Sequence, residues 1–367
     1  MSLLFQPLTL RQLTLPNRVV VSPMCQYSSE DGFANDWHLV HSGSRATGGA
    51  GLVIFEATAV TADGRITPQD LGLWKDEQIE PLRRITQFIE GQGSVAGIQL
   101  AHAGRKASTW QPWLGKHGSV PIAEGGWVPV APSAVAFDPQ HTRPTAVDRD
   151  DIASIRRAFV ETAERALAAG FKVAEVHAAH GYLLHQFLSP LSNRREDDYG
   201  GNFENRIRLL LEVTADVRAV WPEELPLFVR VSATDWVEDG WDVDETVELA
   251  RRLKTLGRRP DRRLLRWHRS PGGHSYRARL PDPVRRAGAQ GSRHPQWRGR
   301  HDHRCGPGRA RAAYRAGRSG AVGTRTAARS LLAAQRCRVP ARKGFLATPV
   351  RACRAPDTPL RKPFGAE

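Results

Sequence analysis

Short apolar runs alternate with helical patterns along residues 1–257, and this alternation constrains the fold more than any other feature of the chain. The runs of strand length are Arg18–Met24, Gly51–Ala57, Val95–Ala101, Phe171–His177 and Pro226–Val231. The segments with helical periodicity are Glu77–Glu90, Asp148–Ala169, Asn205–Val220 and Asp244–Leu256. Most of the apolar runs are rich in β-branched residues, which is typical of strands buried on both faces. Repeated strand–helix units predict a parallel sheet.

The chain has 367 residues, enough for one large barrel or for two ordinary domains. A parallel sheet of this size is found in the (β/α)₈ TIM barrel and in doubly wound folds. No GxGxxG motif follows the first apolar run, which counts against a dinucleotide-binding Rossmann domain. We therefore predict an α/β fold of the (β/α)₈ type. Residues 103–148, which contain three tryptophans and many Pro and Gly, are expected to be an insertion that caps the barrel mouth.

Composition favours a cytoplasmic, soluble protein. Hydrophobic residues make up 40% of the chain, enough for a core. No apolar run reaches 18 residues, so no membrane span is expected. The N-terminal residues lack the pattern of a secretory signal. The four cysteines form neither a disulfide framework nor a paired metal motif.

The net charge of +15 conceals a sharp break in the chain. Residues 258–367 carry 28 basic and 5 acidic residues, whereas residues 1–257 carry 25 basic and 33 acidic ones. The C-terminal part is crowded with Arg, Pro, Gly and Ala, contains no Ile, Met or Asn, and shows no helix or strand period. It is either an arginine-rich tail for nucleic acid or a stretch translated in the wrong frame of a GC-rich gene.

Polar residues collect where the predicted strands end. The ends are Pro23 to Tyr27, Glu56 to Thr58, Gln99 to His102, His177 to Tyr182, and Arg230 within the fifth run. In a (β/α)₈ barrel the C-terminal strand ends form the active-site face, so five such ends predict a site there. The two histidines of the fourth end could also be a zinc pair or incidental polar residues. Zinc takes further Cys, His or carboxylate ligands, and those candidates are scattered, so no metal site is expected.

Residues 4–257 closely resemble the Old Yellow Enzyme family of flavin oxidoreductases. The strings that carry the resemblance are SPMCQYSSEDGFANDWH, GLVIFEATAV, GIQLAHAGRKAS, EVHAAHGYLLHQFLSPLSNRREDDYGGNFENRIRLLLE and LFVRVSATDW. The match is to the bacterial, xenobiotic reductase-like branch with a cysteine at the first strand end. The resemblance implies an FMN-bearing barrel in which NAD(P)H reduces FMN and the flavin then reduces an activated alkene or a nitro compound.

Three residues would act on the acceptor in this reading. His177 and His180 would donate hydrogen bonds to its carbonyl or nitro oxygen, as an oxyanion hole does. Tyr182 would protonate the carbon opposite the hydride. Tyr27 would line the substrate pocket, although it could instead be a barrel-rim aromatic.

The resemblance also implies a set of flavin contacts. These are Ser22, Pro23, Met24, Cys25, Ala57, Gln99 and Arg230. Cys25 would tune the flavin potential, although a free cysteine is most often a small buried hydrophobe. Gln99 can offer its amide both as donor and as acceptor. Arg230 would stabilise the anionic flavin, and its alternative is a salt bridge to a carboxylate on a neighbouring strand.

Family strands six to eight and the FMN phosphate loops are missing beyond Gly257 as the chain is written. A one-base shift of the reading frame, with suitable synonymous codons, permits GVDLIDVCSGG from Gly257 to His268 and a family-like eighth-strand motif from Ala316 to Ala333. We therefore hypothesise a frameshift near codon 257, so that residues 258–367 are the misread remainder of the barrel. The chain as written is then expected to fold poorly, because a barrel of five strands leaves open edges.

Three functions thus compete. The first is the FMN-dependent NAD(P)H oxidoreductase acting on small α,β-unsaturated carbonyl or nitro compounds, a homodimer or homotetramer if the frame is repaired. The second is a nucleic-acid-binding protein that uses the basic tail, in which aromatic residues for base stacking are sparse. The third is a nonfunctional frameshifted product. No specific nucleic-acid partner and no membrane association are expected.

Overall fold

The computed structural model describes residues 2–256 of the chain. The basic segment 258–367, the proposed frameshift with the missing strands six to eight, and the FMN phosphate loops all lie outside the described residues. Within residues 2–256, no helix is both long and apolar enough to cross a lipid bilayer.

The described residues alternate between strands and helices along the chain. The strands are β1 (Leu8–Leu10), β2 (Leu13–Leu15), β3 (Val20–Val21), β4 (Leu52–Ala59), β5 (Val95–Ala101), β6 (Val130–Ala131), β7 (Thr145–Ala146), β8 (Val173–Ala178) and β9 (Leu227–Val231). The α-helices are α1 (Asp36–Thr47), α2 (Ile79–Gly91), α3 (Arg149–Ala168), α4 (Leu183–Leu188), α5 (Phe203–Val220) and α6 (Val243–Leu256).

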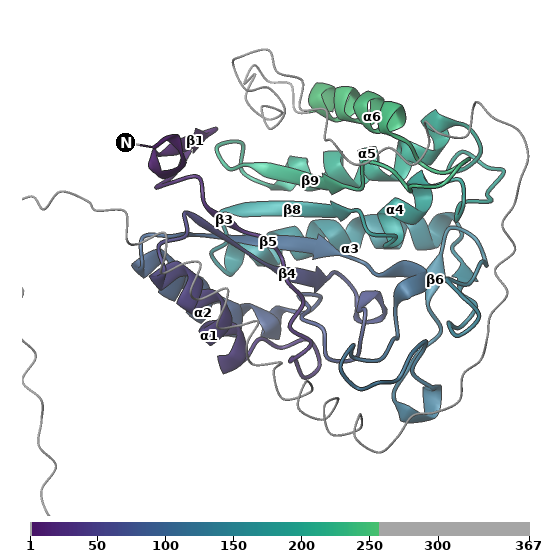
Figure 1. Cartoon of the computed structure of the whole chain (residues 1–367), viewed down its shortest axis with the longest axis horizontal. Helices are drawn as coiled ribbons and strands as arrows, with labels where there is room; N and C mark the ends of the chain where they lie inside the picture. Colours follow the sequence, from purple (N-terminus) through teal and green to yellow (C-terminus); the bar gives the residue numbers. More distant parts are fainter. Residues whose placement is uncertain (1, 257–367) are drawn as a thin grey trace, which may run out of the picture. The chain divides into compact units, whose positions relative to one another are not determined.

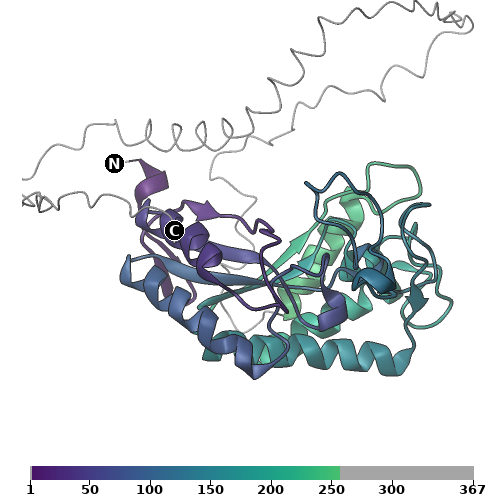
Figure 2. The same ribbon diagram turned by 90° about the horizontal axis from the view of Figure 1, so that it is seen from below.

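A five-stranded parallel sheet in the order β3-β4-β5-β8-β9 forms the centre of the described part. Helices α1, α2, α3, α5 and α6 follow one another as packed neighbours, and they cover the same face of the sheet (Figures 1 and 2). The sheet and this helix layer have the arrangement of half a barrel, so the parallel α/β sheet predicted from the sequence is confirmed. Strands β3 and β9 are its two outer strands.

The core lies between the sheet and the helix layer. Every residue of β4 is buried, as a strand covered on both faces requires. Phe55 of β4 packs edge-on against Phe171, with ring centroids 5.0 Å apart. Helix α3 supplies Ile152, Phe159 and Ala163 from the stripe that faces the sheet. The parallel strands thereby bring their carboxyl ends to one edge of the molecule.

The first strand is shorter than predicted. The sequence pattern predicted a strand over Arg18–Met24, but only Val20 and Val21 pair with β4. Pro23 has no N–H to donate to a ladder. Further along, the amide of Gln26 bonds the side chain of Glu56 at 2.8 Å instead of a neighbouring strand. The segment after β3 is therefore an irregular loop across the end of the sheet.

Two helices near the sheet were not predicted. Helix α1 has a glycine in its middle, so its sequence favours a helix only weakly. Asn35 caps it, and its interior Gly43 lets Phe88 of α2 approach so closely that a Cβ would lie 2.7 Å from the ring. Helix α4 spans six residues, all buried, which is too short for periodicity to identify. Packing against neighbouring helices and strands decides both helices.

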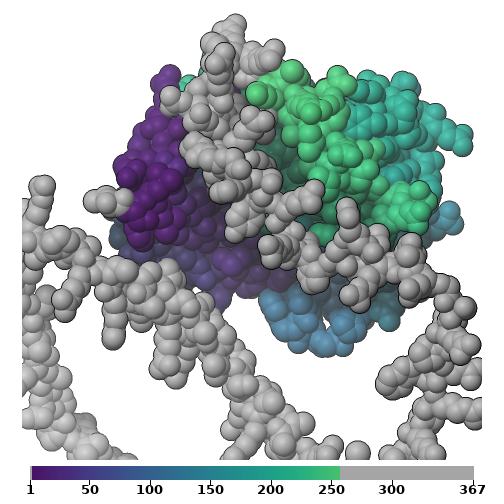
Figure 3. Space-filling model, turned by 45° about the horizontal axis from the view of Figure 1, so that its top comes forward, coloured from purple at the N-terminus to yellow at the C-terminus, as the bar shows by residue number. Residues whose placement is uncertain are grey.

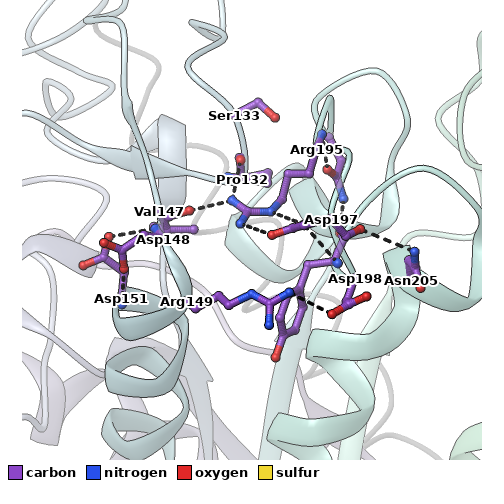
Figure 4. Close-up of polar contacts among 12 residues, drawn as sticks. Pro132, Ser133, Val147, Asp148, Arg149, Asp151, Arg195, Asp197, Asp198 and Asn205 are labelled. Atoms are coloured by element: carbon purple, nitrogen blue, oxygen red, sulfur yellow. Dashed lines mark hydrogen bonds and ion pairs between the residues drawn. The ribbon is translucent and has the colours of Figure 1, made fainter.

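The segment after α4 is joined to the insertion of residues 103–148. Arg195 donates to the carbonyl oxygens of Pro132 and Val147 and forms a bidentate pair with Asp197 (Figure 4). Arg149 reaches Asp198 from the start of α3. The short parallel ladder of β6 and β7 is therefore anchored to the segment between α4 and α5. Whether the insertion caps a complete barrel stays a prediction.

The N-terminal residues and α6 lie on opposite sides of the face seen in Figure 3. They belong to the two outer regions of the sheet, because β1 and β2 precede β3 whereas α6 follows β9.

Candidate active site

Strand register places five side chains on one face of the sheet. Ala57, Gln99 and Glu175 are in register across β4, β5 and β8, and His177 is in register with Arg230 of β9. Side chains alternate along a strand, so His177, two residues after Glu175, points the same way. The helices cover the other face (Figure 2). The sheet thus presents a small side chain, an amide, a carboxylate, an imidazole and a guanidinium side by side.

The polar centre of this row is a hydrogen-bonded pair. Gln99 Nε2 donates to Glu175 Oε1 at 2.7 Å. Burial raises the pKa of Glu175, and the Gln99 bond and the nearby Arg230 charge offset part of that rise. Arg230 forms no ion pair within 4.0 Å among residues 2–256, so the salt bridge considered from the sequence is not formed there. Its guanidinium is half-buried beside His177 and His180.

Three side chains meet at the carboxyl end of β8. The His177 ring lies 5.1 Å from that of His180 and 5.1 Å from that of Tyr182, both edge-on. The Tyr182 and His180 centroids are 6.5 Å apart. Lys106 Nζ lies 5.1 Å from the Tyr182 ring centroid and donates to the carbonyl oxygen of His180 at 3.0 Å. The fourth strand end of the sequence analysis is thus a compact cluster.

The protonation states of this cluster follow from burial. Desolvation lowers the pKa of His177 to about 3, helped by the charges of His180, Arg230 and Lys106. Burial and the same cations also lower the pKa of His180. Burial raises the pKa of the Tyr182 phenol. At neutral pH both imidazoles are therefore uncharged and the phenol keeps its proton.

The tautomer of His177 follows from one backbone contact. The Ala179 N–H approaches His177 Nδ1 at 3.4 Å. Because an amide can only donate, Nδ1 must be the unprotonated nitrogen, so the proton is on Nε2. His177 and Tyr182 are thus two neutral donors in contact.

Cys25 and Tyr27 lie in the irregular segment after β3. Burial raises the pKa of the Cys25 thiol, and the carboxylates of Asp70 and Glu56 raise it further. Burial likewise raises the pKa of Tyr27, whose ring lies 5.6 Å from that of Trp113 in the insertion. Gln111 Nε2 donates to the Tyr27 carbonyl oxygen at 2.8 Å. Both side chains are therefore neutral at the strand ends.

The other expected contact residues differ in exposure. Ala57 and Gln99 are buried, Pro23 is half-buried, and Ser22 and Met24 are exposed. The predicted site residues therefore gather from β3, β4, β5, β8 and β9 at one edge of the sheet.

Two buried carboxylates at the site received no role from the sequence. Glu56 lies within an apolar strand, where a charged residue is itself a signal, and its Oε1 is 3.2 Å from His38 Nε2. Asp70 shares a small hollow with Tyr182, Ala57 and Ala101. Asp70 accepts from the N–H groups of Ile66 and Thr67, and no sequence pattern reveals that burial.

Among residues 2–256, no three His, Cys, Asp or Glu side chains are arranged to hold a metal ion. The side chains of Asn193 and Arg194 do not join the cluster. Asn193 Nδ2 bonds the carbonyl oxygens of Phe187 and Tyr199 and thereby stabilises the loop after α4.

Comparison with known proteins gives a consistent result. Residues 3–269 match the NADH:flavin oxidoreductase / NADH oxidase family. An NADH:flavin oxidoreductase of Gibberella zeae is 51% identical over 266 residues, which cover 69% of this chain and 64% of that protein. The NADPH dehydrogenase of Bacillus subtilis is 47% identical over 256 residues, covering 69% of this chain and 70% of the relative.

Solved structures agree on the fold. Morphinone reductase superposes with a TM-score of 0.58 at 32% identity over 68% of this chain and 69% of the other. The Old Yellow Enzyme homologue of Zymomonas mobilis gives 0.59 at 30% identity over 69% of this chain and 70% of the other. The chain thus matches less than two thirds of its Gibberella relative and about 70% of the others.

Proposed function

Because the chain belongs to the NADH:flavin oxidoreductase / NADH oxidase family, as its resemblance to the Old Yellow Enzyme family predicted, we propose that it is an FMN-dependent NAD(P)H oxidoreductase whose acceptors are activated alkenes or nitro compounds. The observation that carries the proposal is the contact of His177, His180 and Tyr182, three neutral donors beside the polar row of the sheet.

The residues on the sheet suit FMN, the cofactor that the family implies. Ala57 is small enough to leave a flat surface beside Gln99. The Gln99 amide can pair with a pyrimidine ring, which offers both donors and acceptors. Arg230 supplies a cation without a carboxylate ion-pair partner among residues 2–256, so it can neutralise an anionic ring edge. Pro23 and Cys25 border the same edge, where we assign Cys25 to tuning the redox potential, with Ser22 and Met24 as outer contacts.

When bound, FMN supplies the hydride relay between the reduced nicotinamide and the acceptor. His177 and His180 bind the acceptor's carbonyl or nitro oxygen and stabilise the negative charge that develops there. Neutral imidazoles suit this role, because they donate a hydrogen bond without needing to lose or gain a proton. Both rings are neutral near pH 7, since burial lowers the pKa of His177 to about 3 and also lowers the pKa of His180.

Tyr182 delivers the proton that completes the reduction. Its phenol keeps the proton across the neutral range because burial raises the pKa. Its contact with His177 places the phenol beside an acceptor bound by the same cluster. Tyr27 and Trp113 form an aromatic wall from the other side of the strand ends, suited to a flat conjugated substrate.

The test uses the full-length chain with FMN, NADPH and 2-cyclohexen-1-one. Flavin absorbance that remains with the protein on gel filtration is the first requirement of the proposal, and it would also overturn the expectation that the chain as written folds poorly. Tyr182→Phe should slow the acceptor half-reaction by about 10²-fold or more while flavin reduction by NADPH is unchanged. Tyr199→Phe is the matched control, because its hydroxyl bonds Glu212 away from the cluster. A full-length chain that takes up no FMN, or a Tyr182→Phe variant with an unchanged acceptor half-reaction, refutes the proposal.

A further inference from the structure

The turn that carries the donor cluster has an unusual backbone. His180 and Gly181, between β8 and α4, both have positive φ values of 61° and 73°. A residue with a side chain adopts this left-handed conformation at a cost of about 1–2 kcal/mol, so surrounding contacts must hold it. The direction in which the His180 and Tyr182 side chains leave the chain depends on this turn.

Side chains from two other segments bond both amides of the turn. The His180 N–H donates to Ser232 Oγ at 2.9 Å, and the Gly181 N–H donates to His185 Nδ1 at 2.8 Å. Gln186 Nε2 donates to the carbonyl oxygen of Gly181 at 2.8 Å. Ser232 follows β9, whereas His185 and Gln186 belong to α4. The turn is thus tied on both sides of the Gly181 peptide.

The contact to Gly181 determines the tautomer of His185. An amide N–H can only donate, so Nδ1 must be unprotonated and the ring proton must be on Nε2. Nε2 lies 3.2 Å from Asp235 Oδ1, and the two side chains are only 7% and 11% exposed. Nε2 is buried without a well-aligned hydrogen-bond partner, so its attraction to the carboxylate is chiefly electrostatic.

Asp235 is itself held in place. Its Oδ2 accepts from Ser189 Oγ at 2.6 Å and from the Trp241 N–H at 2.8 Å. Burial alone would raise the pKa of Asp235, but His185, Ser189 and the Trp241 amide outweigh it and bring the pKa to about 2. The carboxylate is therefore charged at neutral pH, and it faces the Nε2 proton.

We propose that Asp235 and His185 are positioning residues for the donor cluster. Asp235 selects the His185 tautomer that accepts the Gly181 N–H, and that bond fixes the turn from which His180 and Tyr182 project. The catalytic consequence rests on the function proposed above, whereas the structural claim can be tested without it. Ser232 and Asp235 both follow β9. The loop after β9 therefore contacts the His180 amide directly through Ser232, and it acts on the Gly181 amide through Asp235 and His185.

Three variants separate the tautomer from simple packing. In Asp235→Asn the Trp241 N–H still requires an oxygen acceptor, so the asparagine side chain keeps its oxygen there and turns its NH₂ toward His185. The His185 ring must then accept at Nε2 and carry its proton on Nδ1. A proton on Nδ1 faces the Gly181 N–H, so two donors oppose each other. The same tautomer change follows when the aspartate that orients a catalytic histidine is replaced by asparagine. His185→Asn keeps an acceptor near the Nδ1 position, whereas His185→Phe removes it.

The experiment measures amide hydrogen exchange of the full-length chain together with the ¹⁵N chemical shifts of the His185 ring. Asp235→Asn and His185→Phe should speed exchange of the Gly181 amide about tenfold, the effect of losing one hydrogen bond, whereas His185→Asn retains the protection. Asp235→Asn should also move the ring proton from Nε2 to Nδ1. Asp216→Asn, which removes a carboxylate paired with Arg156, is the charge-matched control and should change neither.

Three outcomes overturn the proposal: unchanged Gly181 exchange in Asp235→Asn, a His185 proton that stays on Nε2, or equal loss of protection throughout β8. The last outcome would mean that the pair only stabilises the fold. With NADPH and 2-cyclohexen-1-one, Asp235→Asn should slow the acceptor half-reaction about tenfold, and an unchanged rate also refutes the positioning role. A chain that takes up no FMN but gives the expected exchange result refutes the proposed function alone.

Discussion

Gln99 and Glu175 lie in register on β5 and β8, and the Gln99 amide donates to the Glu175 carboxylate at 2.7 Å. A carboxylate accepts from NH₂ and repels the amide oxygen, so this contact fixes which end of the Gln99 amide faces β8. The remaining oxygen is then directed away from Glu175. Glu175 thereby sets the orientation of a residue that we assign to the flavin pyrimidine.

Glu175→Gln is therefore expected to weaken FMN binding about tenfold, because an amide at position 175 accepts either orientation of Gln99. Fluorescence titration of FMN into the full-length chain measures the change in dissociation constant. Glu212→Gln, on α5 beside Arg156, is the control and should leave the constant unaltered. An unchanged constant in Glu175→Gln would show that Glu175 does not orient Gln99.

The buried pair of His38 and Glu56 is expected to matter for stability. Both side chains are 3% exposed or less, and Glu56 also accepts the amide of Gln26 in the loop that carries Cys25. Glu56→Ala leaves the part-buried Gln26 amide without its acceptor and His38 Nε2 with only Ser29 Oγ at 3.3 Å, so the free energy of unfolding should fall by about 1–3 kcal/mol. Urea unfolding followed by tryptophan fluorescence measures this. A loss below about 1 kcal/mol would be within the range of a surface pair and would contradict the prediction.

Asp70 should make stability depend on pH. Burial raises its pKa from 3.8 to about 7, although the hydrogen bonds from Thr67 and Ile66 lower the pKa and offset part of this effect. Between these values the folded chain binds more protons than the unfolded one, so this contribution to stability is present at low pH and lost as the pH rises toward 7.

The stability advantage of the parent chain over Asp70→Asn should therefore be about 2–3 kcal/mol greater at pH 5 than at pH 8. Urea unfolding of both proteins at the two pH values gives the difference directly. A difference that is constant, or that grows with pH, is incompatible with a raised Asp70 pKa.

Cys25 should react slowly with alkylating reagents. Its pKa lies above the ordinary value of 9, chiefly because of burial, and the thiolate is the nucleophile. Iodoacetamide at pH 8 should modify Cys25 at least about tenfold more slowly in the folded chain than in urea. Peptide mapping by mass spectrometry separates it from the three cysteines of residues 258–367. Equal rates in the two states would argue for a low-pKa thiol instead.

Strand and helix positions were the most predictable part of the fold. Strand β5 and helices α3 and α6 lie within about one residue of the predicted ranges, because buried strands and capped amphipathic helices are encoded by neighbouring residues. The error at Arg18–Met24 arose where the partner of the Gln26 amide is a side chain 30 residues away. Helix α1 escaped prediction because it depends on packing against α2, through Gly43 and Phe88, which its own sequence does not specify.

The candidate site was likewise predictable only in part. His177, His180 and Tyr182 stand close together in the chain, so the motif alone identified them, and the structure brings their rings into contact. Nothing in the sequence pairs His185 with Asp235, 50 positions later. That pairing depends on how β9 and its following loop pack against α4.

By itself, the sequence determined the α/β class, the succession of strands and helices along the chain, and the residues at the strand ends, because these depend on composition and periodicity within a few positions. Only the tertiary structure decided which strands are neighbours, which carboxylates are buried, and which protonation and tautomeric states the histidines adopt. Those properties depend on desolvation and on contacts between residues distant in the chain, such as Glu56 with His38 or Asp235 with His185.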